Sequence, residues 1–365
     1  MSTASPRVVF VVGNAIQADN AVIVAEHLRD QEFSYFDLWQ CKVVAHPSSF
    51  DEHSPAVNLR RMLSIMRFGQ LRPGDVVVIP QDVGLLQRLL ASRARLLGCA
   101  IVLMPDGIVA RGPVLNGRAV RQLVRNTVYR CLNVLGLIEG VPGAMGGSNP
   151  DYILSWGPGW DAAFTRGKDT KIIHLGCPRM DRYDGMSHQE LDRINVLVCS
   201  QPLRIPAHTR AYAKDWYAFL ESLRTLDRSD VNIRIRLHPA EVKSLTVPNA
   251  LRDEHVGRSL ASDLNWASLV ASPFSTVLVE ALASSRAFVA IAPDNKFSRA
   301  ARAYPIFSDV ETPTSVWEID AILSAGLKTP GLARLKDAYL SNLGRSAKLT
   351  ASFLKDLIFR PNLGA

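Results

Sequence analysis

The sequence predicts an α/β protein built from two doubly wound, Rossmann-like domains. Short apolar runs, many of them rich in Val and Ile, alternate with helical patterns along all 365 residues. Apolar strands separated by helices form parallel sheets that are covered on both faces. Hydrophobic residues make up 47% of the chain, which is enough for a large core, and the length fits two domains of ordinary size.

Each expected strand is an apolar run that stops at turn residues or at the start of a helical pattern. Val8–Val12 consists of apolar residues only, and Asn232–Leu237 owes its strand character to β-branched residues. Two stretches with helical spacing, Ser275–Ser284 and Leu332–Phe359, are expected helices. The expected strands are, in chain order, Val8–Val12, Asp75–Ile79, Ala100–Met104, Tyr152–Ser155, Ile172–Leu175, Asn195–Ser200, Asn232–Leu237, Ala267–Ala271 and Ala287–Ala292.

The pattern is weakest between Asp181 and Arg193, where a polar stretch precedes a fresh strand. We therefore expect an N-terminal domain over residues 1–185 and a second domain over residues 186–340. The final helix, residues 341–365, is expected to pack back across both domains. Such domains bind ligands at the carboxyl ends of their strands, and a cleft between the two is expected.

Composition narrows the classes of partner. The net charge of +8 suits an anionic partner such as a nucleotide, an acidic glycan or an anionic membrane face, whereas no basic run is interleaved with aromatics as nucleic-acid binding would favour. No apolar run resembles a membrane span or a signal peptide, so a cytoplasmic location is expected. Neither the histidines nor the cysteines show metal-ligand spacing, so neither a metal nor a cofactor is expected. The cysteines are scattered and odd in number: Cys41, Cys99, Cys131, Cys177 and Cys199.

An acid followed by glycine closes one strand of the first domain, at Asp106-Gly107. Glycine lets the backbone turn, and the carboxylate then stands at the edge of the sheet. There Asp106 can act as a general base that takes the proton of an attacking hydroxyl. The plainer alternative is an aspartate that begins a turn or caps a helix.

His238-Pro239 closes a strand of the second domain. The proline keeps the backbone before it extended, so the direction of the imidazole is fixed at the end of the strand. An imidazole can donate a hydrogen bond to a phosphate near neutral pH. A structural histidine is the alternative when His238 is taken alone.

Hydroxyls gather about thirty-five residues further on, where a strand runs into the helix Ser275–Ser284. Ser272, Ser275 and Thr276, together with free backbone N–H groups and the positive end of the helix dipole, make a phosphate site. Glu280, about one turn inside the helix, binds ribose hydroxyls or supports the loop. Serine and threonine at such a place are also ordinary N-caps.

The acceptor side of the expected cleft is assigned to residues of the first domain. Gly13 and Asn14 follow its first strand, although a lone glycine falls far short of a dinucleotide fingerprint and a plain tight turn explains it equally well. Arg111 begins a basic series that continues with Arg118, Arg121, Arg125 and Arg130. An anionic acceptor, an anionic membrane face or a solvated helix each accounts for that series.

The order of these motifs resembles that of the bacterial sialyltransferases, polysialyltransferases and capsule Kdo transferases, which share an acid-Gly, a His-Pro and a Ser motif on a GT-B fold. The resemblance implies that Asp106 is the general base and that His238, Ser275 and Thr276 contact the phosphate of a CMP-linked donor. The segment Gly176–Asp181 also looks like the domain junction of these enzymes and of CDP-glycerol transferases. Here Pro105 and Thr276 stand where those families often have a second acid and a second serine.

We therefore expect a metal-independent, inverting glycosyltransferase with a CMP-activated sugar as donor and an anionic or membrane-linked glycan as acceptor, active in surface polysaccharide synthesis. Peripheral association with the membrane is compatible with this function. A UDP- or CDP-linked donor, including polyol-phosphate transfer, is the alternative within the same class. A sugar-nucleotide 2-epimerase and a catalytically inactive nucleotide-binding protein remain further alternatives.

Overall fold

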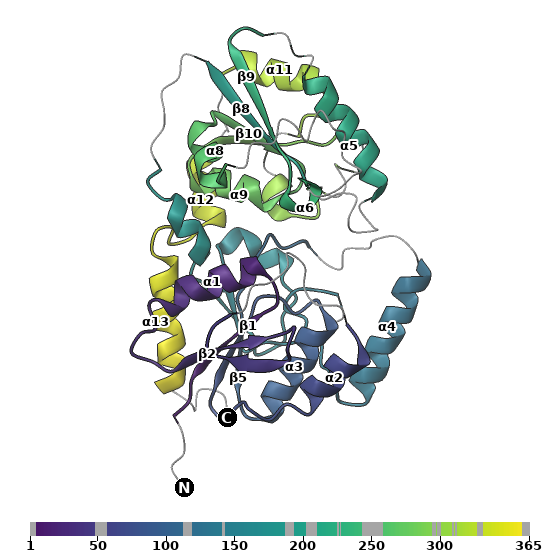
Figure 1. Ribbon diagram of the computed structural model, residues 1–365, viewed down its shortest axis with the longest axis vertical. Coiled ribbons are helices and arrows are strands. Elements are labelled where there is room, and N and C mark those ends of the chain that lie inside the picture. The colour runs from purple at the N-terminus through teal and green to yellow at the C-terminus, as the bar shows by residue number, and fades with distance from the viewer. Residues whose placement is uncertain are drawn as a thin grey trace. The chain divides into compact units, whose positions relative to one another are not determined.

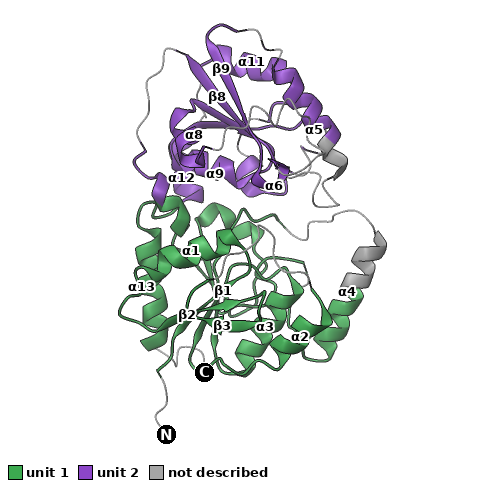
Figure 2. Ribbon diagram, in the orientation of Figure 1, with its two compact units in different colours: residues 1–181, 341–365 green, residues 182–340 purple. Residues whose placement is uncertain are grey.

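The structure is a computed structural model, and it divides into two compact units (Figures 1 and 2). Unit 1 comprises Met1–Asp181 and Ser341–Ala365, and unit 2 comprises Arg182–Leu340. The boundary thus lies a few residues before residue 185, and the last segment belongs to unit 1. The residues described are 5–47, 57–111, 119–140, 143–186, 193–201, 210–224, 226, 228–242, 258–293, 297, 301–308, 310, 312–326 and 331–359, with the side chains of 119–126, 210–213 and 240 left aside.

Unit 1 contains a seven-stranded sheet in the order β3-β2-β1-β4-β5-β6-β7. Every neighbouring pair is parallel except β2 and β3, which are antiparallel. The strands are β1 (Val8–Val12), β2 (Phe33–Asp37), β3 (Lys42–Val44), β4 (Val76–Ile79), β5 (Ala100–Leu103), β6 (Tyr152–Ser155) and β7 (Lys171–His174).

Strands β2 and β3 are absent from the sequence prediction. In β2 a serine interrupts the aromatic residues and an aspartate ends the strand, and β3 has only three residues and lies at the edge of the sheet. Neither strand has the continuous apolar run by which a central parallel strand is recognised. Their assignment depends on pairing in the sheet, since β2 pairs with β1 and β3 pairs with β2.

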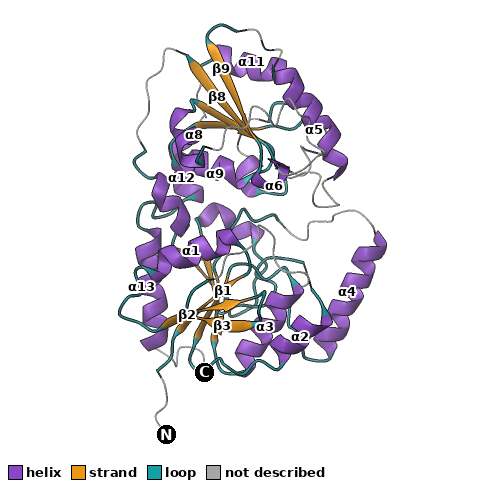
Figure 3. Ribbon diagram, viewed as in Figure 1, coloured by secondary structure: helices purple, strands orange, loops and turns teal. Residues whose placement is uncertain are grey.

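Helices cover both faces of this sheet (Figure 3). Helices α1 (Ala15–Ala25) and α13 (Ser346–Phe359) pack over one face, where Val8, Phe10 and Val12 point. The opposite face, with Val9 and Val11, is covered by α2 (Leu59–Met66), α3 (Leu85–Leu96) and α4 (Ala119–Val134). Alternate residues of each strand therefore enter different cores, as a sheet covered on both faces requires.

Unit 2 contains a four-stranded parallel sheet in the order β11-β10-β8-β9. Its core is built around Trp216 of α5 and the inward residues of the strands, such as Ile235, together with Leu237 directly after β9. The strands are β8 (Ile194–Cys199), β9 (Val231–Arg236), β10 (Leu269–Ser272) and β11 (Ala287–Ala290). The main helices are α5 (Arg210–Leu223), α6 (Pro239–Val242), α8 (Leu260–Trp266), α9 (Thr276–Ala283), α11 (Val316–Ser324) and α12 (Leu332–Tyr339).

The expected helix Leu332–Phe359 is two helices, α12 and α13, with a turn between them. Asn342 and Gly344 both have positive φ, which ends a helix. Asp181 then caps α13, because its carboxylate accepts hydrogen bonds from the backbone N–H groups of Gly344 (2.8 Å) and Ala347 (2.9 Å). α12 packs on α9 in unit 2, whereas α13 packs on α1 and β4 in unit 1.

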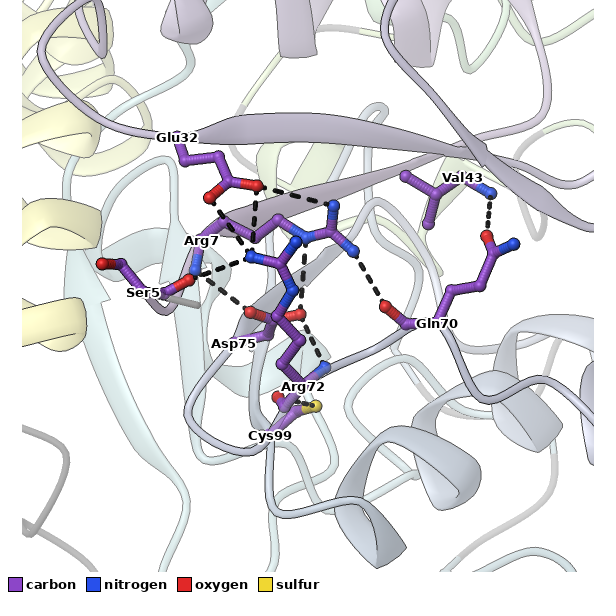
Figure 4. Close-up of polar contacts among 8 residues, drawn as sticks. All are labelled: Ser5, Arg7, Glu32, Val43, Gln70, Arg72, Asp75 and Cys99. Atoms are coloured by element: carbon purple, nitrogen blue, oxygen red, sulfur yellow. Dashed lines mark hydrogen bonds and ion pairs between the residues drawn. The ribbon is translucent and has the colours of Figure 1, made fainter. Parts of the chain in front are cut away.

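An ionic cluster around the buried Asp75 closes the amino-terminal edge of the unit 1 sheet (Figure 4). Asp75 is fully buried and accepts hydrogen bonds from the backbone N–H groups of Arg7 (3.0 Å) and Arg72 (2.9 Å). Both arginines also reach Glu32. Nearby, burial raises the pKa of the Cys99 thiol to about 12, so this cysteine is a neutral core residue. The cluster is structural and lies opposite the edge where ligands bind parallel sheets.

Candidate active site

The carboxyl-terminal edge of the unit 1 sheet carries Asp106, three residues beyond β5, and the turn Gly13-Asn14 directly after β1. Gln17, on the first turn of α1, connects the two loops. Its Oε1 accepts a hydrogen bond from the backbone N–H of Gly13, and its Nε2 donates to Oδ2 of Asp106, both at 2.9 Å. Strand β4 lies between β1 and β5, so Gln17 spans this strand and gives the Asp106 carboxylate a fixed orientation.

Burial raises the pKa of Asp106, and it is the largest influence on that group. The hydrogen bond from Gln17 and the positive charge of Arg179 act in the opposite direction. Arg179 belongs to unit 1 and follows β7, and its backbone N–H donates to Oδ1 of the buried Asn20 at 3.2 Å. A carboxylate held in this way has the raised basicity and the fixed direction that a general base needs.

The other residues predicted on this edge either stabilise the local backbone or are exposed. Asn14 is the N-cap of α1, since its side chain accepts from the backbone N–H of Gln17 (2.9 Å), and the carbonyl of Gly13 accepts from the Trp39 indole (2.9 Å). Gly107 is partly exposed next to Asp106, and Arg111 is exposed. Arg118 and the side chains of Arg121 and Arg125 lie outside the described residues.

The carboxyl-terminal edge of the unit 2 sheet carries His238 two residues beyond β9, and Pro239 opens the short helix α6 directly after it. Glu241 of α6 is buried and holds this turn together. Its carboxylate accepts from the Tyr217 hydroxyl at 2.5 Å and from the backbone N–H of His238 at 3.3 Å. Burial raises the pKa of Glu241, while hydrogen bonds from Ser200, Tyr217 and the His238 backbone oppose the rise.

Helix α9 begins at the same edge. Ser275 is its N-cap, with its hydroxyl 3.4 Å from the backbone N–H of Val277, and Thr276 is its first residue. Ser272 has a structural role instead: it is fully buried and its hydroxyl donates to the carbonyl of Cys199 at 2.7 Å. Glu280 is buried within α9. The N-terminus of α9, with Ser275 and Thr276, therefore has the hydrogen-bond donors that a phosphate requires.

Strand β8 lies between β9 and β10, so His238 and Ser275 are about two strand spacings, roughly 10 Å, apart along the edge. Ser200 and Gln201 directly follow β8, at the start of the next loop. Gln201 of that loop donates from Nε2 to the carbonyl of Phe274 at 2.6 Å, and Ser200 accepts from the Trp216 indole at 2.8 Å. The chain leaves β8 toward β9 and later returns to β10 on its other side, which makes this loop the switch point where such sheets bind ligands.

Sequence reasoning missed Gln17, Ser200, Gln201 and Glu241 as parts of these sites. A polar residue on the buried face of α1 was the available signal for Gln17, and a glutamate three residues after His238 was the signal for Glu241. Among the described residues, no group of three or more His, Cys, Asp or Glu side chains is placed to hold a metal ion.

No protein-family model and no curated protein matches the sequence. Solved structures do match over nearly the whole chain. The wall teichoic acid polymerase TagF superposes with a TM-score of 0.58 at 12% identity, covering 98% of this chain and 90% of that one. The chain has the GT-B fold.

Two further structures match as well. S. aureus MnaA, in a co-structure with UDP, gives a TM-score of 0.55 at 9% identity, covering 97% of both chains. A putative UDP-N-acetylglucosamine 2-epimerase from Listeria monocytogenes gives 0.55 at 11% identity, covering 97% of this chain and 96% of that one. At these low identities the similarity to solved structures concerns the fold alone. It confirms the predicted α/β architecture with two Rossmann-like parts.

Proposed function

We propose that the protein is an inverting, metal-independent glycosyltransferase that moves a sugar, such as sialic acid or a Kdo-like sugar, from a CMP-activated donor to a glycan acceptor of a surface polysaccharide. The observation that carries the proposal is the oriented carboxylate of Asp106. Gln17 holds one of its oxygens at 2.9 Å, and burial raises its pKa. A base of this kind suits the activation of an acceptor hydroxyl.

In this proposal unit 2 binds the donor. The phosphate of CMP receives hydrogen bonds from the N-terminus of α9, from Ser275 and Thr276, and from the imidazole of His238. The negative charge that develops on the leaving phosphate is stabilised by these donors and by the helix dipole. Ser272 and Glu280 support the loop from within the unit, since both are buried.

Unit 1 binds the acceptor, with Asp106 as base and Gly13, Asn14, Gly107 and Arg111 around it. The acceptor hydroxyl transfers its proton to Asp106 while its oxygen bonds to the anomeric carbon. The bond from that carbon to the phosphate oxygen breaks, and CMP leaves with the electron pair. Attack from the face opposite the leaving group inverts the anomeric configuration.

The second candidate is a transferase that uses a CDP-linked donor, including transfer of a polyol phosphate. It is favoured by the likeness to TagF over 98% of this chain, because TagF is a wall teichoic acid polymerase that was also studied after soaking with CDPG. A UDP-linked donor or 2-epimerase activity is the third candidate, favoured by the likeness to MnaA.

Calorimetric titration with CMP, CDP, UMP and UDP separates these candidates. We expect CMP to bind more tightly than UMP, and CMP release to be seen with CMP-sialic acid or CMP-Kdo and oligosaccharide acceptors. Tighter binding of CDP together with turnover of a CDP-polyol would support the second candidate. Preference for UDP would exclude a cytidine donor.

The variant Asp106→Asn tests the base directly. Turnover should fall by about two to four powers of ten, because the amide cannot take a proton, while the affinity for CMP stays unchanged. The exposed Asp169→Asn in the same unit is the matched control and should be fully active. Full activity of Asp106→Asn would reject the assignment of the base.

A further inference from the structure

Positive charge is concentrated in one part of the sequence. Residues 57–138 contain twelve arginines, no lysine, no glutamate and three aspartates, so this segment has a larger positive excess than the whole chain, at +8. None of the three aspartates lies in a helix. Asp75 and Asp82 are fully buried and bonded to backbone N–H groups, and Asp106 belongs to the candidate active site.

This segment forms the helical layer α2-α3-α4 that covers one face of the unit 1 sheet (Figure 1). Some of its arginines serve the fold: Arg88 is fully buried and donates to backbone carbonyls, and Arg95 pairs with Glu139. Others point outward. Arg60 and Arg67 of the α2 region and Arg130 of α4 are exposed, and within the described part of the chain they form no ion pair.

The same layer also exposes apolar side chains. Leu59 and Leu63 of α2 are one turn apart and 70% and 37% exposed, while Val134 and Leu135 at the end of α4 are 89% and 69% exposed. In the described residues, most of the exposed large apolar side chains lie on or beside these three helices. The set is Val57, Leu59, Leu63, Leu96, Val128, Val134 and Leu135, against Ile16, Val22, Trp317 and Phe359 elsewhere.

Leucine and arginine share one side of α2. Ile65 faces the core, and at helical spacing Leu59, Leu63, Arg60 and Arg67 fall on the opposite half of the helix. Met62 and Met66 lie at the margin, half-buried. A helix with a packed inner side and an outer side of leucine and arginine, without any acid, has the character of an interfacial helix.

We infer that the α2-α3-α4 layer docks on an anionic lipid surface. Arginines on this layer are attracted to acidic headgroups, and the exposed leucines and valines enter the boundary between headgroups and acyl chains. A nucleic acid would use the arginines but not the exposed aliphatic side chains, and single strands require aromatic platforms for stacking. The inference is independent of the donor and of the transfer reaction.

Vesicle flotation with the full chain tests the inference. We expect binding to vesicles of phosphatidylcholine with about a third phosphatidylglycerol, no binding to pure phosphatidylcholine, and weaker binding as salt rises. Equal binding to neutral and anionic vesicles, or binding to neither, would overturn the inference.

The double variant Arg60→Gln/Arg67→Gln tests how much positive charge contributes to vesicle binding. Affinity for anionic vesicles should fall about 25-fold, at about fivefold per arginine. The matched control Arg29→Gln/Arg166→Gln removes two exposed arginines from loops elsewhere in unit 1 and should leave binding unchanged. An equal loss in the control would mean that only net charge matters, which contradicts a defined surface.

The double variant Leu59→Ser/Leu63→Ser isolates the apolar part and should weaken vesicle binding at least tenfold. Its control is Ile16→Ser/Val22→Ser on α1, whose side chains are 46% and 36% exposed. An unchanged midpoint of thermal unfolding shows that each variant is folded. The wild type could instead bind duplex DNA but no vesicles, with DNA binding lost in the arginine variant. That result would show that the partner of this layer is a nucleic acid and not a lipid surface.

Discussion

Gln17 determines how Asp106 is presented, although it belongs to a different part of the sequence. The backbone N–H of Gly13 can only donate, so it selects the oxygen of the Gln17 amide as its partner. The amide nitrogen must then face Asp106, to which it donates at 2.9 Å. The orientation of the candidate base thus depends on a turn after β1.

Replacing Gln17 with Met keeps the size of the side chain but removes this hydrogen bond. Because the bond from Gln17 opposes the effect of burial, the pKa of Asp106 should rise further in the variant. A base works only when ionised, so the acidic limb of the pH profile of kcat/KM should move to higher pH. Gln31→Met serves as the control. If the acidic limb of the pH profile does not shift in Gln17→Met, the role of Gln17 is contradicted, while the assignment of Asp106 as base is not affected.

Substitution of His238 tests the proposed donor site. His238→Ala should raise the dissociation constant for CMP by about 10- to 150-fold, since a hydrogen bond to a charged group contributes about 1.5–3 kcal/mol. The fold should persist, because the hydrogen bond by which Glu241 holds this turn comes from the backbone N–H of His238, which the substitution leaves in place. The control His174→Ala removes a histidine of unit 1 that is paired with Asp161 at 3.0 Å. Unchanged affinity in His238→Ala would make His238 a structural strand end.

At the scale of elements, Glu241 joins α6 to α5. It is 1% exposed and accepts from Tyr217 of α5 and from the turn after β9. This connection positions the loop that carries His238. The hydroxyl of Tyr217 and the N–H of His238 would both lose their acceptor if the carboxylate were removed.

Glu241→Ala should therefore lower the free energy of unfolding by about 1–3 kcal/mol for each buried donor left without a partner. Chemical denaturation measures this loss, with the exposed Glu221→Ala of α5 as control. A loss no larger than that of the control would contradict the bridging role.

The variant Glu241→Gln adds a pH test. Burial raises the pKa of Glu241 in the folded state, so folding favours the protonated form. Its contribution to stability is complete below the pKa of the unfolded chain and decreases as pH rises through the folded pKa. The wild type should therefore lose stability relative to Glu241→Gln as pH rises through this window.

At the scale of the whole molecule, unit 1 is assembled from two separated parts of the chain. Helix α13 contributes Ala351, Leu354 and Ile358 to a core that otherwise comes from the first half of the sequence. Asp181 secures its start through hydrogen bonds of 2.8 and 2.9 Å to the backbone of Gly344 and Ala347. The end of the chain is thus part of the unit that carries Asp106.

Asp181→Ala should destabilise unit 1 by about 0.5–2 kcal/mol, the usual cost of losing an N-terminal helix cap. Proteolysis under native conditions should then cut in or near α13 more readily, while cleavage within unit 2 stays the same. Asp184→Ala, just beyond the boundary, is the control. Equal protection of α13 in both variants would show that the cap is dispensable.

The sequence by itself determined the parallel strands other than β2, and the residues that follow them. Val8–Val12 and Tyr152–Ser155 were predicted with their observed bounds, and Asp106, His238 and Ser275 lie at the carboxyl-terminal edges as expected. These features are local: an apolar run makes the strand, and the residue after it must stand at the edge of the sheet. Their roles in catalysis stay predictions.

Only the tertiary structure decided which side chains meet. Gln17 and Asp106 are 89 residues apart, and the hydroxyl of Ser272 bonds to Cys199, 73 residues away, rather than joining the other hydroxyls. Strands β2 and β3 and the turn at Asn342 were also beyond the sequence pattern. Such pairings depend on the order of strands in the sheet, which is a property of the whole unit and is not encoded in any short stretch of residues.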